Sequence, residues 1–225
     1  VQGNKEKTSL LQMIPQKVLD RLQKNGGTAL VVDEHKTVTV LTCEFSSLSE
    51  MALTFSKADL VLAVNDLLAA FDNLAVKHDV YKVENLVEGY MVISGHEESS
   101  SRDHHLRILN MALDMVSTAQ RARLPDGQVG VSVRIGMHCG PAYAAVIGFK
   151  HAAYTFFGHT ISITSRLESK GFPGCIHASA AMKHMLDAEM EWAEYSEQYT
   201  KDQGIIVTYI AKVGDWEAAV ADRAL

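Results

Sequence analysis

The sequence predicts one α+β domain, in which helices pack on a mixed β-sheet, preceded by a short helical stem. Three observations lead to this fold class. Runs rich in β-branched residues alternate along the chain with amphipathic helical patterns. No internal repeat and no Pro-, Gly- or Ser-rich linker divides the 225 residues. Apolar residues make up 47% of the chain, which is ordinary for a globular protein. We therefore expect a stem over residues 1–27 and one domain over residues 28–225.

The stem is predicted from residues 9–23, where apolar side chains recur at helical spacing. Asn25, Gly26 and Gly27 end this pattern. Pro15 lies inside it and should kink or restart the helix, because proline has no amide proton and its ring clashes with the preceding turn.

The first half of the domain reads as a strand, a helix, a hairpin, a helix and a strand. A β-branched run predicts a buried strand at residues 37–43, and an apolar stripe predicts a helix at residues 57–78. Two strand-like runs predict a hairpin over residues 80–94. A second amphipathic helix is expected at residues 106–121, followed by a strand at residues 128–139.

The second half contains two helices and three strands after a Gly- and aromatic-containing stretch at residues 140–158. The two helices are expected at residues 160–169 and 179–186, the latter capped by Ser179. The strands are expected at residues 175–178, 192–199 and 204–211.

Composition excludes several classes of protein. The balance of 21 Lys and Arg against 27 Asp and Glu gives a net charge of −6, which excludes binding of nucleic acid by bulk attraction. The longest apolar runs fall far short of the roughly 18 residues that a membrane-spanning helix needs. Three cysteines without C-x-x-C spacing favour a reducing compartment. The chain does not begin with Met, so we expect it to be a piece of a longer protein.

Three segments carry motifs that belong together. Residues 82–95 read KVENLVEGYMVISG, residues 133–141 read VRIGMHCGP, and residues 154–169 read YTFFGHTISITSRLES. In this order they resemble the hairpin, the following strand and turn, and the catalytic loop and helix of class III nucleotidyl cyclases. Within that family the chain resembles receptor-type and rhodopsin-type guanylate cyclases, and the resemblance runs from residue 9 to residue 211.

The resemblance implies a ferredoxin-like βαββαβ core, with active sites between two such domains. In this family the 3′-hydroxyl of a nucleoside triphosphate attacks the α-phosphorus, and pyrophosphate leaves. Two divalent ions, Mg²⁺ or Mn²⁺, lower the pKa of the hydroxyl and neutralise the triphosphate. The two metal-binding Asp residues of the family fall on Glu44 and Glu88. Both keep a carboxylate but are one methylene longer, and Mg²⁺ demands near-ideal geometry.

The positions that would recognise the base match the family better than the two metal-binding positions do. Glu84 falls where guanylate cyclases have a Glu and adenylate cyclases a Lys. A carboxylate there accepts hydrogen bonds from N1–H and the 2-amino group of guanine, whereas it would repel the acceptor N1 of adenine. Thr155 falls on the second base position, where its hydroxyl can donate to O6 of guanine.

Three further positions are implied for the ribose and the phosphates. Arg166 falls on the Arg that stabilises the transition state, and Ser162 on the Asn that orients the ribose. Because Ser is shorter and offers one hydroxyl, ribose orientation should be weaker. Lys201 falls on the Lys that binds the triphosphate, where a point charge suits a phosphate.

The histidines are expected to play no part in this chemistry. His104 and His105 lack the paired spacing of a zinc site, and we expect both to be solvated at the surface.

Three hypotheses follow. In the first, this is a guanylate cyclase domain that acts as a dimer, best as a heterodimer whose partner brings the metal ions. The second is a pseudo-cyclase, a regulatory or dimerisation module, which the loss of both Asp residues and of the Asn favours. The third is an active homodimer with Glu-bound Mn²⁺. We expect the domain to bind GTP. The stem suggests an upstream sensor, so we also expect the domain to be the cytoplasmic part of a larger membrane-bound or sensor-linked protein.

Overall fold

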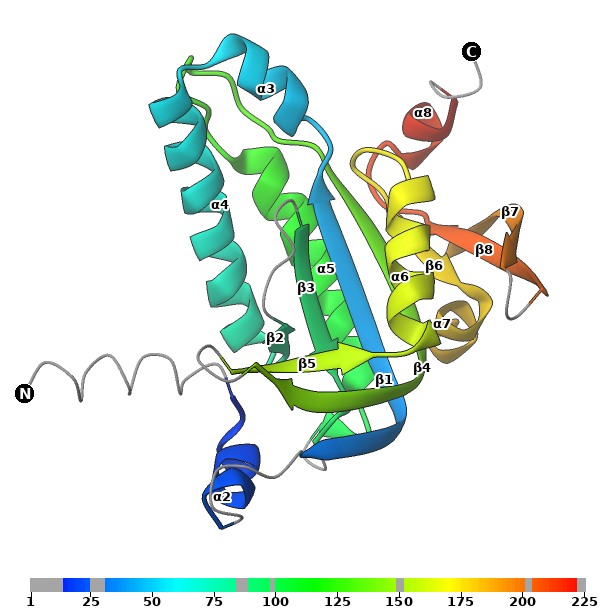
Figure 1. Cartoon of the computed structure of the whole chain (residues 1–225). Helices are drawn as coiled ribbons and strands as arrows, with labels where there is room; N and C mark the ends of the chain where they lie inside the picture. Colours follow the sequence, from blue (N-terminus) through cyan, green and yellow to red (C-terminus); the bar gives the residue numbers. More distant parts are fainter. Residues whose placement is uncertain are drawn as a thin grey trace, which may run out of the picture.

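The computed structural model describes residues 14–24, 31–83, 89–97, 100–148, 152–200 and 204–221. Within them an eight-stranded sheet carries helices on both faces (Figure 1). The strand order is β2-β3-β1-β4-β6-β8-β7, and β5 pairs with β4 outside this path. The predicted boundary at residue 27 lies outside the described residues and stays a prediction.

The first half of the chain forms the βαββαβ core. β1 is antiparallel to both β3 and β4, and β2 is antiparallel to β3. The α+β class and the ferredoxin-like core are therefore confirmed. The elements of this half are β1 (Val32–Phe45), α3 (Leu48–Thr54), α4 (Lys57–Lys77), β2 (Tyr81–Val83), β3 (Gly89–Ser94), α5 (His104–Arg121) and β4 (Val133–Ile147).

The second half extends the sheet beyond β4, where β6 is parallel to β4 and β8 and β7 follow antiparallel. Ser179 caps α7 as predicted, since its hydroxyl accepts a hydrogen bond from the amide of Met182. The elements are β5 (Ala153–Phe157), α6 (His159–Lys170), β6 (Ile176–Ser179), α7 (Ala180–Met185), β7 (Trp192–Thr200), β8 (Gly204–Ala211) and α8 (Trp216–Ala221).

The two faces of the sheet are covered by different helices. On β1 the buried side chains of Leu41, Cys43 and Phe45 join the large core cluster that includes α4 and α5. Because side chains alternate along a strand, Thr42 and Glu44 point to the opposite face. On that face α6 packs across β4 and β1 (Figure 1). The strand thus presents Glu44 to the side of the sheet that α6 covers.

The stem helix α2 (Gln16–Lys24) begins directly after Pro15, as expected for a helix that restarts at proline. Its buried residues Val18 and Leu19, together with Ile14 before the helix, join a second apolar cluster with residues of β1, β3 and β5. The predicted stem residues before Ile14 lie outside the described part of the chain. No helix in the described ranges is long and apolar enough to cross a membrane.

Two strands are longer than the sequence predicts. The first half of β1 pairs with the second half of β4, from Val32 opposite Ala145 to His35 opposite Ala142. β5 pairs with the same part of β4 on its other edge. Most of residues 140–158, to which the sequence analysis assigned no element, is therefore strand.

The prediction for His104 was wrong. It is 5% exposed, and its Nδ1 lies 2.6 Å from the hydroxyl oxygen of Thr39 on β1. The charged residues before it favour a solvated loop, but α5 begins at His104 and turns this side chain onto the sheet.

Two buried histidines predict that the protein loses stability in acid. Burial lowers the pKa of both His138 and His177 to about 4. The unfolded chain takes up protons near pH 6.5 while the folded chain does not, so stability falls as the pH drops from about 6.5 towards 4. Each histidine contributes at most about 3 kcal/mol to this loss at pH 4.

Urea unfolding at several pH values measures this effect. The free energy of unfolding should decrease steadily below pH 6.5, and His138→Asn should make the decrease shallower. Substitution of the exposed His184 to Asn is the matched control and should leave the slope unchanged. A free energy that stays constant between pH 7.5 and 4.5 would contradict the prediction.

Candidate active site

Helix α6 carries two of the predicted site residues and lies very close to β4. A Cβ atom at Gly136 would lie 2.4 Å from the amide nitrogen of Glu168 and 2.4 Å from the carbonyl oxygen of Thr164. At the start of the helix, the hydroxyl of Thr160 donates to the carbonyl oxygen of Pro141 at 2.7 Å. The absence of a side chain at Gly136 therefore fixes how near α6 comes to the sheet.

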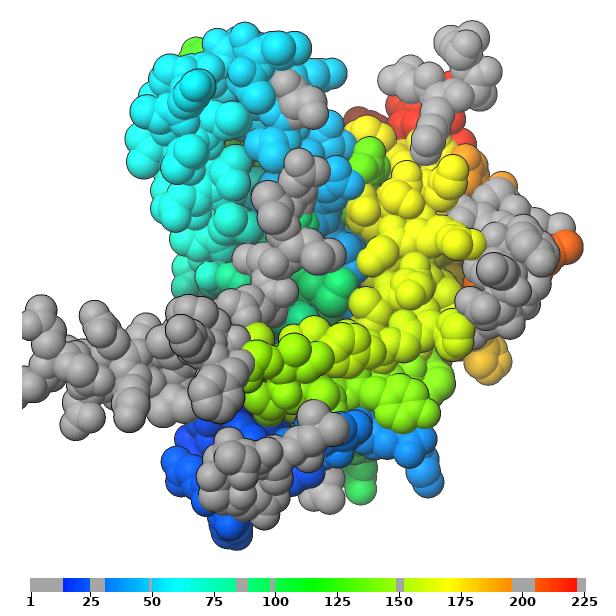
Figure 2. All heavy atoms as spheres, viewed as in Figure 1, coloured from blue at the N-terminus to red at the C-terminus, as the bar shows by residue number. Residues whose placement is uncertain are grey.

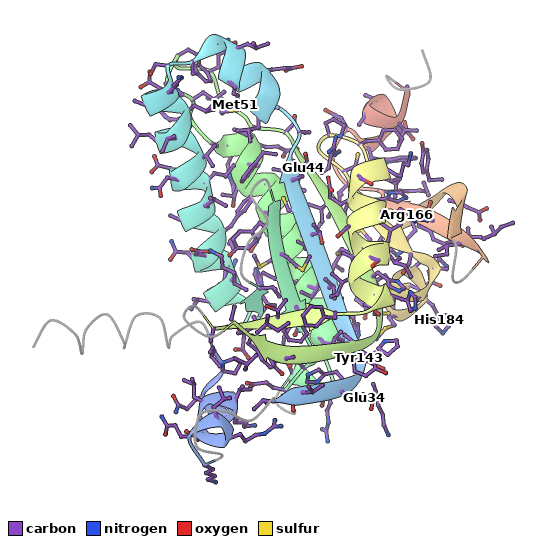
Figure 3. All side chains as sticks on the ribbon, viewed as in Figure 1. Glu34, Glu44, Met51, Tyr143, Arg166 and His184 are labelled. Atoms are coloured by element: carbon purple, nitrogen blue, oxygen red, sulfur yellow. The ribbon has the colours of Figure 1, made fainter. Side chains whose placement is uncertain are left out.

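Ser162 and Arg166 lie one turn apart and are both exposed. The opposite side of α6 is buried against the sheet by Thr160, Ile163, Thr164, Leu167 and Glu168. Figure 2 shows α6 in yellow, open at the surface beside the β4–β5 strands. Figure 3 shows Arg166 on this helix and Glu44 at the end of β1. The structure thus presents Ser162 and Arg166 on one solvent-facing side of a fixed helix.

Glu44 is engaged by an arginine that the sequence analysis did not select. Arg134 lies opposite Glu44 in the β1–β4 register. Its Nη2 lies 2.5 Å from a carboxylate oxygen of Glu44, and its Nε donates to Glu168 at 3.1 Å. Arg134 and Glu44 are half-buried, whereas the side chain of Glu168 is 8% exposed. One guanidinium therefore bridges two carboxylates where β1, β4 and α6 meet.

The charged groups in this cluster affect the pKa values of one another. Burial raises the pKa of Glu168 to about 7, the nearby Glu44 carboxylate adds to the shift, and Arg134 opposes it. Burial opposes the charge on Arg134, but its hydrogen bonds to Glu168 and Glu44 hold its pKa above the usual value. Arg134 is thus a permanent cation at the strand end where the predicted metal residue Glu44 lies.

The motif VRIGMHCGP contains Arg134, so a signal for it was present in the sequence. The motif by itself predicts a strand and a turn and assigns no role to its arginine. Only the strand register shows that this arginine lies directly opposite Glu44.

Thr155 lies on β5, opposite Ala145 of β4, and is half-buried. Its neighbour Tyr154 is buried and donates a hydrogen bond to Asp33 at 2.9 Å. Asp33 in turn pairs with Arg21 of α2 at 2.5 Å. The strand that carries Thr155 is therefore tied to the stem helix.

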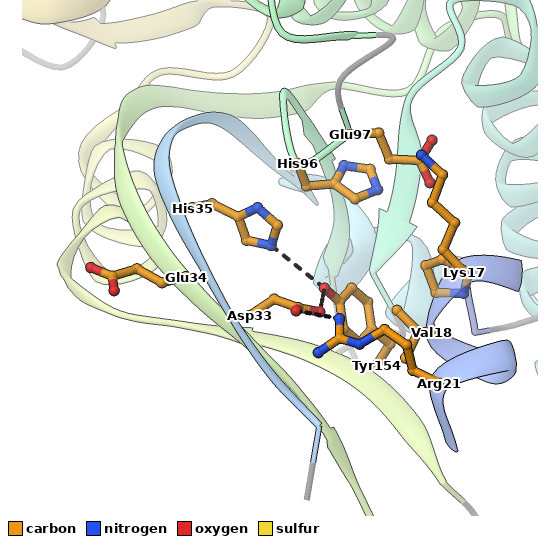
Figure 4. A pocket seen from close by; sticks show the side chains of 10 residues that line it. Lys17, Val18, Arg21, Asp33, Glu34, His35, His96, Glu97 and Tyr154 are labelled. Atoms are coloured by element: carbon orange, nitrogen blue, oxygen red, sulfur yellow. Dashed lines mark hydrogen bonds and ion pairs between the residues drawn. The ribbon is translucent and has the colours of Figure 1, made fainter. Parts of the chain in front are cut away.

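A cavity of about 280 Å³ lies at this joint between α2 and the sheet (Figure 4). Its lining includes Arg21, Asp33, His35, His96 and Tyr154. Burial, together with the neighbouring His35, lowers the pKa of His96 to about 4. None of Glu44, Thr155, Ser162 and Arg166, the predicted site residues that the structure describes, lines this cavity.

Three predicted site residues, Glu84, Glu88 and Lys201, lie outside the described residues. Glu84 and Glu88 fall in the segment that connects β2 to β3, and Lys201 falls between β7 and β8. Their roles stay predictions.

Divalent ions are the cofactor that the resemblance implies, and the described side chains do not make a complete site for them. Glu44 is the predicted ligand among these residues, and its carboxylate is already bound by Arg134. No group of three or more His, Cys, Asp or Glu side chains in the described part of the chain is arranged to hold a metal ion.

Comparison with known proteins gives consistent matches. The family model for the adenylate and guanylate cyclase catalytic domain matches residues 30–212. Receptor-type guanylate cyclase gcy-13 of Caenorhabditis elegans is 32% identical over 91% of this chain and 20% of its own length. The chain spans about a fifth of the length of the curated receptor-type relatives that it matches first.

Solved structures of guanylate cyclase domains are similar to this chain as well. The guanylate cyclase domain of RhGC from Catenaria anguillulae in complex with GTP has a TM-score of 0.74 and 27% identity, covering 80% of this chain and 98% of that one. The non-canonical dimeric guanylyl cyclase domain of the RhoGC fusion protein from Blastocladiella emersonii has a TM-score of 0.72 and 25% identity. That comparison covers 80% of this chain and 98% of the other.

Proposed function

Because this chain belongs to the adenylate and guanylate cyclase catalytic domain family, we propose that it is a guanylate cyclase domain that converts GTP to cGMP and pyrophosphate. One observation carries the proposal most strongly. α6 presents Arg166 and Ser162 together on its exposed side, at the positions that the motif YTFFGHTISITSRLES implies. The receptor-type relatives and the GTP complex of the similar domain support GTP as the substrate.

We further propose that this chain supplies one side of a site shared between two domains. Arg166 is exposed at the surface, where a second domain can bring a nucleotide to it. Glu44 instead pairs with Arg134, and a carboxylate held by a guanidinium is a poorer ligand than an unpaired one. Domains of this family use divalent metal ions, and in this proposal the partner's carboxylates hold them.

Each residue of this chain then has a defined task. Glu84 and Thr155 bind the guanine edge, so that GTP is favoured over ATP. Ser162 orients the ribose, and Lys201 binds the triphosphate. The guanidinium of Arg166 stabilises the negative charge that grows on the phosphoryl oxygens as the 3′-hydroxyl attacks and pyrophosphate leaves. Arg134 anchors the end of β1 against α6 through Glu44 and Glu168.

The β4–β5 strands offer the surface on which a second domain would pack. Tyr143, Ile147 and Phe157 are between 40% and 50% exposed, although all three are large apolar residues. Tyr143 and Phe157 lie opposite one another in the β4–β5 register. Large exposed apolar side chains that adjoin one another are typical of interaction sites. We propose a cyclase domain as the partner, either a second copy or a related chain.

The domain is also proposed to be one part of a larger protein. Its receptor-type relatives are about five times longer than the matched segment. We place it in the cytoplasm, joined through α2 to an upstream receptor or sensor region.

Substitution of Glu84 by Lys tests the base specificity of this proposal. The assay mixes the chain with a copy in which Glu44→Asp and Glu88→Asp restore the metal residues and Arg166→Ala removes the transition-state cation. We call this variant the metal-side copy. In the mixture, Glu84→Lys in the otherwise unchanged chain should lower cGMP formation by at least about 100-fold, because a lysine cannot accept from guanine.

Glu50→Lys, at an exposed position on α3, makes the same charge change elsewhere and is the control. It should leave cGMP formation unchanged. Output that is equal for the Glu84→Lys and Glu50→Lys proteins would reject the base role of Glu84 and favour a pseudo-cyclase.

A further inference from the structure

A carboxylate on α4 joins the two strands of the hairpin that precedes α5. The Oδ1 atom of Asp72 accepts a hydrogen bond from the hydroxyl of Tyr90 on β3 at 2.7 Å. The same oxygen lies 2.6 Å from the ammonium nitrogen of Lys82 on β2. That nitrogen also lies 4.9 Å from the centre of the Tyr90 ring. Asp72, Lys82 and Tyr90 therefore form a closed set of contacts, which we call the Asp72 clamp.

The clamp rests on a rigid base. Tyr90 is fully buried. Its ring packs in a T-shaped arrangement with that of Phe71, the residue before Asp72, and the two ring centres lie 5.5 Å apart. The ring of Phe71 in turn stacks on that of Phe45, with 6.0 Å between the two ring centres. Phe45 directly follows Glu44 on β1. A column of three aromatic rings thus connects the clamp to the strand end that carries Glu44.

β2 is a short edge strand that the clamp attaches to α4. It has three residues, it lies at the edge of the sheet, and it pairs only with β3, through Tyr81, Lys82 and Val83. A strand this short has few backbone hydrogen bonds to hold it in place. The salt bridge from Lys82 to Asp72 attaches its middle residue to α4.

The clamp lies next to the predicted site. Gly89 on β3 pairs with Glu44 on β1, and Tyr90 follows it. In the sequence, Lys82 is two residues before Glu84, and Tyr90 is two residues after Glu88. Both strands that lead to these predicted residues are therefore attached to the same carboxylate of α4.

We propose that Asp72 is a positioning residue of the cyclase site, holding β2 and β3 in the arrangement that GTP recognition requires. This inference rests on the proposed function. Asp72 acts through Lys82 and Tyr90 and does not touch the nucleotide. A displacement of about 1 Å near the reacting groups can cost about 100-fold in rate, so a small shift of the hairpin has a measurable effect.

The test compares Asp72→Ala and Tyr90→Phe with the control Asp66→Ala, which removes an exposed carboxylate from the same helix. Tyr90→Phe removes only the hydroxyl and keeps the buried ring, so it remains informative if Asp72→Ala folds poorly. Each variant is mixed with the metal-side copy, and KM, kcat and the preference for GTP over ATP are measured. Amide hydrogen exchange at Tyr81–Val83 is measured on each variant alone.

We expect Asp72→Ala and Tyr90→Phe to raise KM for GTP about 10-fold or more and to reduce the preference for GTP. General destabilisation would instead reduce the turnover of both nucleotides in proportion and leave the preference intact. Amide exchange in β2 should become faster in both variants. The double variant should be no worse than Asp72→Ala, because both changes break the same contact. Asp66→Ala should behave as the unchanged chain.

Unchanged KM and nucleotide preference in both variants would overturn the inference, whether or not exchange in β2 becomes faster. A mixture of the unchanged chain and the metal-side copy that makes no cGMP would instead contradict the proposed function. The exchange measurement would still show in that case whether Asp72 holds β2.

Discussion

Arg166→Ala is expected to lower cGMP formation by about 100- to 1,000-fold when the variant is mixed with the metal-side copy. Arg166 is proposed to be the cation that meets the charge developing on the α-phosphoryl group. A donor that acts mainly in the transition state lowers kcat when it is removed and changes KM little. The exposed position of Arg166 on α6 means that the fold should tolerate its loss.

Two measurements and one control variant make this prediction specific. Steady-state kinetics give kcat and KM, and urea unfolding shows whether the variant retains its stability. The control variant is Arg121→Ala, which removes the same charge from the exposed end of α5. It should leave kcat and KM unchanged. A fall in kcat of less than about threefold for Arg166→Ala would mean that another residue stabilises the transition state.

Gly136→Ala is expected to have the largest effect on stability. The new Cβ would lie 2.4 Å from two backbone atoms of α6, which is closer than real contacts allow. Backbone atoms cannot move aside as the end of a side chain can, so the whole helix must shift. We expect the free energy of unfolding to fall by about 3 kcal/mol or more. Any protein that folds should also lose activity, because α6 carries Ser162 and Arg166.

Urea unfolding measures the loss, and Gly89→Ala is the matched control. A Cβ at Gly89 would lie 3.4 Å from the carbonyl oxygen of Cys43, which is an ordinary contact. This control should unfold at nearly the same urea concentration as the unchanged chain. Equal stability of the two variants would show that α6 is not held against β4 in the way described.

Local patterns were sufficient to predict most elements of the fold. The helix over residues 57–78 has a clear apolar stripe, and α4 ends within one residue of that prediction. The short helix α3 was not predicted. Nor was the arm of the sheet in which the first residues of β1 and all of β5 pair with the second half of β4. The arm is stabilised by pairing between distant segments, such as Asp33 with Ala144, and its strands include exposed and polar residues. Periodicity within one segment carries no information about such a partner.

In the candidate site, too, some residues could be predicted from the sequence, whereas others depend on contacts between distant segments. The resemblance to class III cyclases indicated Glu44, Thr155, Ser162 and Arg166, because these residues fall on positions to which that family gives a role. The resemblance did not indicate that Arg134 binds Glu44, which depends on the register between two strands far apart in sequence. Nor did it indicate Asp72, whose role depends on α4 lying beside the hairpin. Contacts of this kind follow from packing and have no local pattern.

Formation of cGMP from GTP and Mn²⁺ tests the central proposal most directly. The unchanged chain and the metal-side copy are assayed separately and then as an equimolar mixture. Each alone should make little cGMP, because one lacks the Asp ligands and the other lacks the arginine at position 166. The mixture should make far more than the sum of the two. Strong cGMP formation by the unchanged chain alone would contradict the division of tasks between domains, and a mixture without cGMP would contradict guanylate cyclase activity.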